Sequence, residues 1–315
     1  KLWLEEWHAS PWHLEQAVWY DEGQEWSPLS RAVRAASGSG GQGSIPGASG
    51  NKIPVEVVRE VSLGVVRALV RMGAEVDGTL NKYKKTPLIE AAERGDAEVV
   101  KVLLELGANV KATDIFHRTA LHMAAHFGHA EVARLLLKNK ADKYTQMGAQ
   151  DHNMIHGGTP LHQAAANAHP EVVKAILESR INPDTRCVDG RTALYYAAAS
   201  GDEESVKLLL DARASPDLMS EPRGGEETVA PIHVAALAGH TEVCQLLVKG
   251  GADINIQDHL QRTPLHLAAA EGHAGTVKAL LELGADWKAK DKTGRYPEDM
   301  SASKTIMAVF DSGKI

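Results

Sequence analysis

Apolar positions along the chain recur in pairs of short segments that have helical spacing. After Thr119, the side chains of Leu121 and Ala125 lie on one face of a predicted helix, and Gly128 follows it. Residues 131–137 carry a second apolar stripe with i, i+3 and i+4 spacing. Threonine is a preferred N-cap, and glycine often ends a helix because it tolerates positive φ angles. The pattern therefore predicts two short helices joined by a tight turn.

The same pair of helices recurs at a fixed distance along the chain. Six copies open with Thr or Ala, then Pro or Ala, then an aliphatic residue; they begin at Thr86, Thr119, Thr159, Thr192, Ala230 and Thr263. Successive copies lie 33 residues apart, except for two spacings of 40 and 38 residues that each fit 33 plus a short insertion. Degraded copies at Ser27 and Tyr296 extend the series. One unit cannot bury its apolar faces alone, so the series predicts a stack of units.

This series resembles the ankyrin repeat, whose signature is Thr-Pro-Leu-His-x-Ala at a period of about 33 residues. The signature is complete at 159–164 and 263–268, and the resemblance covers roughly residues 24–300. It implies an all-α solenoid of helix–turn–helix units with β-hairpin-like turns, about seven repeats plus a degenerate C-terminal cap. The expected domains are an N-terminal extension (1–25), seven repeats (26–292), and a capping repeat with its tail (293–315).

The longest departure from the period is an insertion at about 37–60, inside the first expected repeat. Of the 14 residues from 37 to 50, 10 are Gly or Ser, a composition typical of a flexible coil. It is interpreted as an insertion between two helices, with an artificial linker as the alternative. Shorter insertions at 144–158 and 219–229 fall in expected hairpin loops. Such insertions either line a binding face or are tolerated loop growth, and both interpretations stay open.

Composition narrows the class of protein further. The net charge of the 315 residues is -7, which argues against a general nucleic-acid or anionic-membrane binder. No run of 18 apolar residues is present, so no membrane span is predicted. Two cysteines, Cys187 and Cys244, exclude a disulfide scaffold and favour a reducing intracellular compartment. The expected location is the cytoplasm or nucleus, with an organelle open because the sequence starts at Lys1 rather than at a methionine.

The first 25 residues differ from the repeats in composition. They contain six acidic residues and a single basic one, Lys1, and four tryptophans: Trp3, Trp7, Trp12 and Trp19. Tryptophan is enriched at binding hot spots and is poorly accommodated in water. The segment is therefore expected either to cap the open end of the stack or to dock on another protein, and one segment could do both.

The residues that could suggest a metal or phosphate-binding site do not form one in the sequence. His122, His126 and His129 include an i, i+4 pair typical of zinc sites, but Met123 stands where a metalloprotease needs glutamate. Histidines also recur at the position of His122 in other repeats, and the resemblance implies that they bond to neighbouring backbone. The Gly/Ser stretch lacks the Gly-Lys-Ser/Thr ending of a phosphate-binding loop. No metal, cofactor or catalytic site is predicted.

The resemblance implies that partners bind the concave face formed by hairpin tips and first helices. The positions after the motif His, or after the Ala-Ala pair, are expected to be exposed there. The predicted partner-binding residues are Ile115, Phe116, His117, Met123, His126, Phe127, Gln163, Asn167, Tyr196, Val234, Leu237, His259, Leu260 and Leu267. Exposed apolar side chains in such numbers mark an interaction site.

These observations predict a non-enzymatic adaptor that binds segments of one or more partner proteins. Nucleic acid is not an expected partner. The alternative is a structural or peripheral subunit of a large assembly, anchored through the N-terminal extension and the loop insertions. An enzyme would need a catalytic domain outside these 315 residues. Fold alone does not name the partner.

Overall fold

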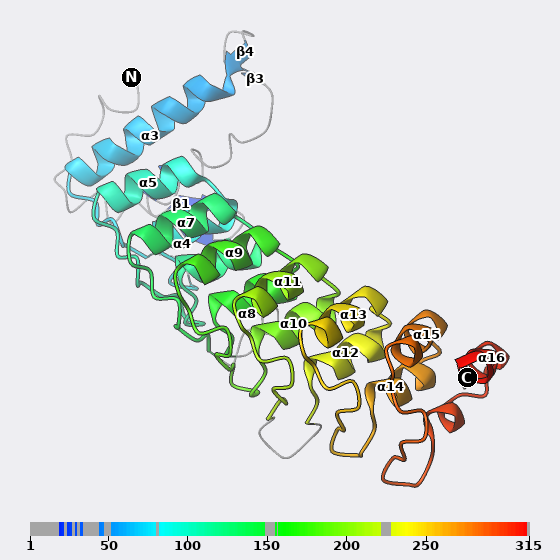
Figure 1. Ribbon diagram of the computed structural model, residues 1–315. Helices are drawn as coiled ribbons and strands as arrows, with labels where there is room; N and C mark the ends of the chain where they lie inside the picture. Colours follow the sequence, from blue (N-terminus) through cyan, green and yellow to red (C-terminus); the bar gives the residue numbers. More distant parts are fainter. Residues whose placement is uncertain are drawn as a thin grey trace. The chain divides into compact units, whose positions relative to one another are not determined.

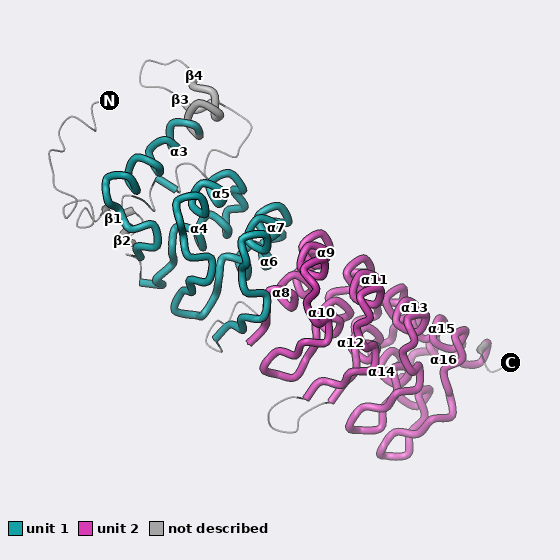
Figure 2. Tube along the Cα trace, turned by 60° about the vertical axis from the view of Figure 1, so that its left-hand side comes forward, with its two compact units in different colours: residues 1–150 teal, residues 151–315 magenta. Residues whose placement is uncertain are grey.

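The computed structural model describes residues 19–21, 24–26, 29, 32–33, 44–46, 52–79, 82–148, 155, 157–221 and 228–313. The chain divides into two compact units, residues 1–150 and 151–315 (Figure 2). Each unit is built of helix pairs joined by hairpin loops, so the helical repeat fold predicted from the sequence is confirmed. In the described part of the chain, no helix is both long and apolar enough to cross a membrane.

Unit 1 holds five described helices and two short ribbons. The helices are α3 (Val55–Arg71), α4 (Pro87–Arg94), α5 (Ala97–Glu105), α6 (Ala120–His126) and α7 (Ala130–Lys138). The antiparallel ribbons pair β1 (Trp19–Asp21) with β2 (Gln24–Trp26), and β3 (Ser44–Pro46) with β4 (Lys52–Pro54). First helices α4 and α6 lie in one layer, and second helices α5 and α7 lie in another with α3 beside α5 (Figure 1).

Unit 2 repeats the same arrangement. Its first helices are α8 (Pro160–Ala166), α10 (Ala193–Ser200), α12 (Pro231–Ala238) and α14 (Pro264–Ala270). Its second helices are α9 (Pro170–Glu178), α11 (Glu203–Asp211), α13 (Thr241–Lys249) and α15 (Ala274–Glu282). The 3-10 helix η1 (Pro297–Met300) and helix α16 (Lys304–Gly313) close the C-terminal end. Ile306 and Phe310 of α16 are each 1% exposed, so this end of the core is covered.

Local sequence fixes where each first helix begins. Thr86 caps α4 by accepting a hydrogen bond from the backbone N–H of Ile89 (3.3 Å), and Pro87 follows at the first helical position. Two residues before the motif the backbone turns left-handed, as at Lys84 (φ 51), His117 (φ 58) and Gln261 (φ 58). This turn reverses the chain at each hairpin tip, so the tips project from the layer of first helices (Figure 1).

Buried histidines join successive repeats of unit 2. The backbone N–H of Thr159 donates to Nδ1 of His162 (3.2 Å), so the neutral ring carries its proton on Nε2. That Nε2 donates to the carbonyl of Arg191 (3.1 Å), 29 residues further along the chain. His233 and His266 make the equivalent bonds to the carbonyls of Arg262 (3.1 Å) and Arg295 (3.2 Å). The backbone role implied for these histidines is thereby observed.

The first repeat agrees with the sequence analysis in part. Leu29, Ala32 and Val33 are helical and buried, as expected of its first helix. Its second helix α3 starts at Val55, inside the range assigned to the insertion. The helix can start there because residues 55–71 contain no proline and only one glycine, Gly64. Trp3, Trp7 and Trp12 lie outside the described residues, and the backbone of Trp19 pairs with that of Trp26.

Candidate functional site

The hairpin loops and the adjoining first helices form one surface in each unit, called the hairpin face below (Figure 1). Met123, Gln163 and Leu267 were expected to be exposed on it, and that expectation is wrong: they are 1%, 0% and 3% exposed. All three follow the motif His inside a first helix of only seven residues. Neighbouring elements cover such a short helix on all sides through its first turns, so exposure begins only at its C-terminal end.

On unit 1 the tip of one hairpin presents apolar and aromatic groups. Ile115 is 45% exposed, and His117 is exposed beside it. Phe116 is half-buried, with its ring centroid 6.0 Å from that of Tyr83 and 4.7 Å from the guanidinium carbon of Arg118. Packing of this kind fixes the tip and leaves Ile115 facing solvent.

At the end of α6, Phe127 is held in place and remains open to solvent. Its ring meets that of His126 edge-on, with centroids 4.8 Å apart, and stacks near His129 at 6.2 Å. His129 is itself fixed, because its Nε2 lies 3.0 Å from the carbonyl oxygen of Glu93. The Phe127 side chain is 45% exposed. An ordered aromatic ring in this state is suited to bury apolar area on another molecule.

On unit 2 the predicted residues are partly exposed. Leu237 at the end of α12 and Leu260 at a hairpin tip are 45% and 36% exposed. Asn167 is exposed, and Val234, His259 and Tyr196 are half-buried. The predicted partner-binding residues fall in both units: Phe116, Met123 and Phe127 belong to unit 1, and Tyr196 and Leu237 belong to unit 2.

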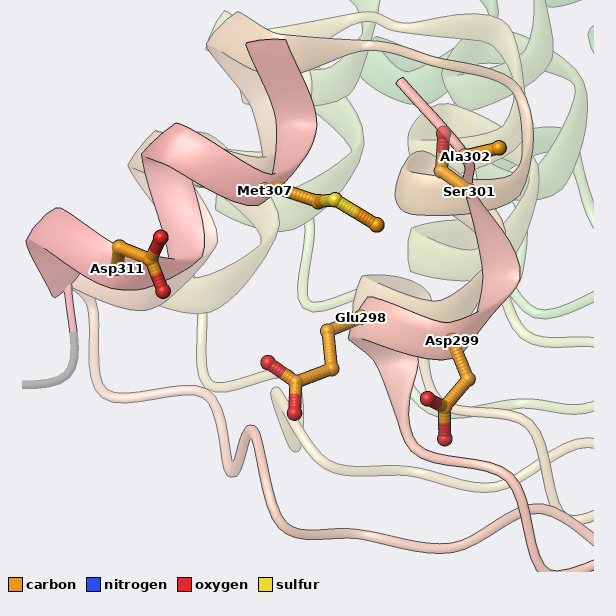
Figure 3. A pocket seen from close by; sticks show the side chains of 6 residues that line it. All are labelled: Glu298, Asp299, Ser301, Ala302, Met307 and Asp311. Carbon is orange, nitrogen blue, oxygen red and sulfur yellow. The ribbon is translucent and has the colours of Figure 1, made fainter. Parts of the chain in front are cut away.

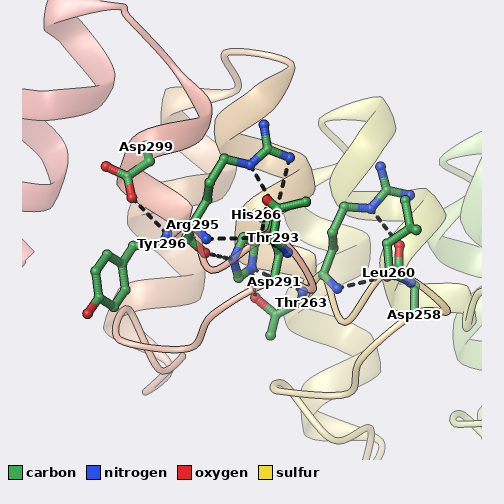
Figure 4. Close-up of polar contacts among 10 residues, drawn as sticks. Asp258, Leu260, Thr263, His266, Asp291, Thr293, Arg295, Tyr296 and Asp299 are labelled. Carbon is green, nitrogen blue, oxygen red and sulfur yellow. Dashed lines mark hydrogen bonds and ion pairs between the residues drawn. The ribbon is translucent and has the colours of Figure 1, made fainter.

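Two hairpins of unit 2 contain an aspartate–arginine pair that sequence reasoning missed. Asp258 Oδ2 accepts from Nε of Arg262 (2.7 Å), and Asp291 Oδ2 accepts from Nε of Arg295 (3.0 Å), as Figure 4 shows. Although burial opposes its ionisation, hydrogen bonds from Thr293 and Arg295 hold the pKa of Asp291 well below its usual range. The Asp-x-x-x-Arg spacing before each motif was the available signal.

The repeat that begins at Thr192 departs from its relatives within the chain. Tyr195 stands where other repeats have the motif His, and Cys187 stands where other hairpins have aspartate. The rings of Tyr195 and Tyr196 meet edge-on with centroids 5.4 Å apart, and Tyr196 meets the ring of His162 at 5.9 Å. The Tyr196 hydroxyl lies 3.6 Å from Sγ of Cys187. These rings bring an aromatic, half-buried cluster to the hairpin face of unit 2.

A hollow of about 480 Å³ opens at the C-terminal end, beside η1 and α16 (Figure 3). Its lining residues are Glu298, Asp299, Ser301, Ala302, Met307 and Asp311. Asp299 is engaged in capping η1, because it accepts a hydrogen bond from the backbone N–H of Tyr296 (2.8 Å).

The described residues offer little reactive chemistry. Among them, no group of three or more His, Cys, Asp or Glu side chains is placed to hold a metal ion. Cys244 is 0% exposed, and burial raises the pKa of its thiol to about 12, so the thiol stays protonated. A buried, protonated thiol is inert as a nucleophile.

Comparison with known families agrees with this architecture. The model for ankyrin repeats matches residues 57–147, 145–220 and 217–291, so the chain belongs to the ankyrin repeat family. Two solved structures share the fold: the human ASB11 ankyrin repeat domain (26% identity, TM-score 0.62) and the ankyrin repeat domain of Bcl-3 (25%, 0.61). Each alignment covers 72% of this chain, and 97% and 98% of the other chains. Ankyrin repeats are protein–protein interaction modules.

Three curated relatives align over part of the chain. XBAT31 of Arabidopsis thaliana is 37% identical over 106 residues, which are 32% of this chain and 23% of the relative. The E3 ubiquitin-protein ligase XBAT32 of the same plant is 28% identical, over 66% of this chain and 37% of its own. Human transient receptor potential cation channel subfamily A member 1 is 33% identical over 61% of this chain, which corresponds to 16% of the channel's length. The chain thus spans less than two fifths of the length of these relatives.

Proposed function

We propose that this chain is a non-enzymatic adaptor that binds segments of partner proteins on the hairpin faces of its two units. The observation that carries the proposal is Phe127, which is fixed between two imidazole rings and is 45% exposed. Exposed large apolar side chains on a folded surface mark interaction sites. A ring that is already ordered loses little conformational freedom on binding, which favours affinity.

The names of the plant relatives suggest one setting for such an adaptor. XBAT32 is named as an E3 ubiquitin-protein ligase, a class of enzyme that acts on other proteins. In that setting the repeats would bring a target protein to an enzyme. The catalytic groups would then lie outside these 315 residues. The hairpin face, rather than any reactive group, would then determine which protein is recruited.

The proposal is tested with random peptides displayed on phage and selected on the purified chain. Phe127→Ala is expected to weaken the selected peptides that bind unit 1 by roughly tenfold, the usual effect of truncating a hot-spot aromatic. Val65→Ala is the matched control, because Val65 is 42% exposed but lies on α3, away from the hairpin face. Both variants should keep the thermal unfolding midpoint. Equal affinity of the selected peptides for both variants would refute the proposal.

A second candidate function is a structural or peripheral subunit of a larger assembly. It is favoured by exposed apolar side chains along α3, where Val61 and Val65 are 61% and 42% exposed at helical spacing, and by Met72, 39% exposed just after the end of that helix. Light scattering on the protein purified gently from its native source separates the two functions. A peak of fixed stoichiometry, far above the 33.8 kDa of this chain, supports the subunit; a monomer with substoichiometric companions supports the adaptor.

A further inference from the structure

One hairpin of unit 2 keeps an arginine but lacks its aspartate. In three other hairpins of the chain, an arginine donates from Nε to an aspartate four residues earlier: Arg118 to Asp114 (2.6 Å), Arg262 to Asp258 (2.7 Å) and Arg295 to Asp291 (3.0 Å). Figure 4 shows the last two pairs. Arg191 occupies the same place, immediately before the motif Thr192, but four residues before it stands Cys187.

The surroundings of Arg191 do not replace the missing carboxylate. Its Nε is buried and has no hydrogen-bond partner. The guanidinium carbon lies 5.1 Å from the ring centroid of Tyr195, and the side chain shares a hydrogen bond with Tyr196. The negative charge of Asp189 raises the pKa of Arg191 electrostatically. Across the described parts of the chain, however, no carboxylate forms an ion pair with Arg191.

The other polar groups of this hairpin are already engaged. Arg186 donates to the carbonyls of Gly190 (2.7 Å) and Met219 (2.8 Å), and it also pairs with Glu221 at 3.4 Å. Burial and the nearby Cys187 thiol raise the pKa of the Tyr196 phenol, and the hydrogen bond with Arg191 offsets only part of that rise. The phenol therefore stays neutral, and within the described residues Arg191 has no carboxylate in direct contact.

We propose that Arg191, framed by the rings of Tyr195 and Tyr196, recognises an Asp or Glu carboxylate on the bound partner segment. The inference rests on the proposed function, because it assigns a required acidic residue to the partner that the hairpin face of unit 2 binds. A carboxylate is the group that three sister arginines hold in this chain. Guanidinium–carboxylate hydrogen bonds are among the strongest in proteins, and adjoining aromatic rings limit their exposure to water.

The first experiment measures the acidic preference of peptides from the same displayed library. Peptides that compete for unit 2, identified by loss of binding to Leu237→Ser, are expected to share one Asp or Glu. Replacing that Glu with Gln should weaken binding to the unaltered chain about tenfold, and should change binding to Arg191→Met less than twofold. If the peptides bind unit 2 without a shared acid, the inference is wrong and the proposed function still stands. If no peptide depends on Leu237, the proposed function fails for this unit.

A second variant restores the sister pair and keeps the test meaningful if Arg191→Met does not fold. Cys187→Asp places an aspartate four residues before Arg191, as in the other hairpins, and should satisfy the guanidinium internally. It is expected to raise the thermal unfolding midpoint and to abolish the difference between the Glu and Gln peptides. Cys187→Ser is the matched control, because it adds no charge, and it should keep that difference. An undiminished acidic preference in Cys187→Asp would overturn the inference.

A further control concerns an acidic pair of this chain. Glu226 and Glu227 belong to the 219–229 insertion, in the next hairpin along the sequence, and lie outside the described residues. The double variant Glu226→Gln with Glu227→Gln should bind the acidic peptides as the unaltered chain does. Markedly tighter binding would assign Arg191 to the chain's own loop and would overturn the assignment to a partner.

Discussion

His162 shows how a single buried side chain ties stability to pH. The ring is 0% exposed, and burial lowers its pKa to about 4, although the hydrogen bonds that the ring donates to backbone carbonyls raise it. An unfolded histidine binds a proton near pH 6.5. Between these two values the unfolded chain therefore binds more protons than the folded chain, so acidification favours unfolding. Burial likewise lowers the pKa of His233 and His266.

We expect the chain to lose stability as the pH falls from about 6.5 towards 4, with up to about 3 kcal/mol of that loss from His162. The contribution of His162 to stability is fully present above pH 6.5. His162→Gln should be less stable at pH 7.5, where it lacks the native hydrogen bonds, but its stability should fall less steeply over the acidic range. Denaturant midpoints measured by circular dichroism at several pH values report the two slopes. Parallel slopes for the two proteins would contradict the prediction.

At the same scale, the sequence predicted the role of the motif histidines but misjudged the residues that follow them. Met123 and Gln163 lie one position beyond the His, where the periodic pattern alone favours neither exposure nor burial. Their burial depends on cover from neighbouring elements, which a single repeat does not encode. Arg191 was missed for a related reason, since its lack of an ion-paired carboxylate becomes visible only when the contacts of the hairpins are compared.

At the scale of elements, the glycines that end first helices also make room for the next histidine. Gly201 ends α10 at φ 77, and a Cβ there would come within 2.7 Å of the ring of His240. That ring donates from Nε2 to the carbonyl of Ala199 (3.2 Å), so it joins the end of α10 to the start of α13. Gly272, at φ 80, has no atom within 4 Å of such a Cβ. Comparing substitutions at Gly201 and Gly272 therefore separates the cost of backbone strain from the cost of displacing a neighbouring side chain.

Gly272→Ala is expected to cost about 1–2 kcal/mol, the strain of a left-handed alanine. Gly201→Ala should cost about 1 kcal/mol more, because the ring of His240 must leave its position and give up its hydrogen bond. In a His240→Ala background the two glycine substitutions should cost the same. Denaturant unfolding of the unaltered chain, His240→Ala, the two single glycine variants and the two double variants measures these differences. Equal costs in the unaltered background would show that the contact contributes nothing.

Element boundaries were predicted best where the motif is complete. The first helices that begin with Pro160 and Pro264 follow the Thr-Pro-Leu-His motif, which encodes both the cap and the start of the helix. Helix α3 was predicted too short, since its first turn lacks the motif and follows a Gly/Ser-rich stretch. Position along the period identifies a helix, but the local capping residues set its bounds.

At the scale of the whole molecule, the fixed period predicted the order of the helix pairs. Because stacked repeats contact only their neighbours, one repeat of 33 residues specifies the architecture, and deviations from the period locate insertions. Partner preference has no such periodic basis. It arises where repeats differ, as at Cys187 and Phe127, and such differences become meaningful only when their contacts are known.

The neighbour-only coupling of repeats makes the role of the N-terminal extension testable. Val61 and Val65 of α3 are 61% and 42% exposed, so the N-terminal end of the stack has apolar surface to cover. We expect the tryptophan-rich residues 1–25 to act as its cap. Deleting them should speed amide hydrogen exchange in α3, leave exchange in α13 unchanged, and leave peptide binding to both hairpin faces intact. Mass spectrometry of exchanged peptides supplies the measurement, with α13 as the internal control. Unchanged exchange in α3 together with lost partner binding would instead identify the extension as a docking arm, since a segment that stabilises nothing in this chain but is needed for capture must contact the partner.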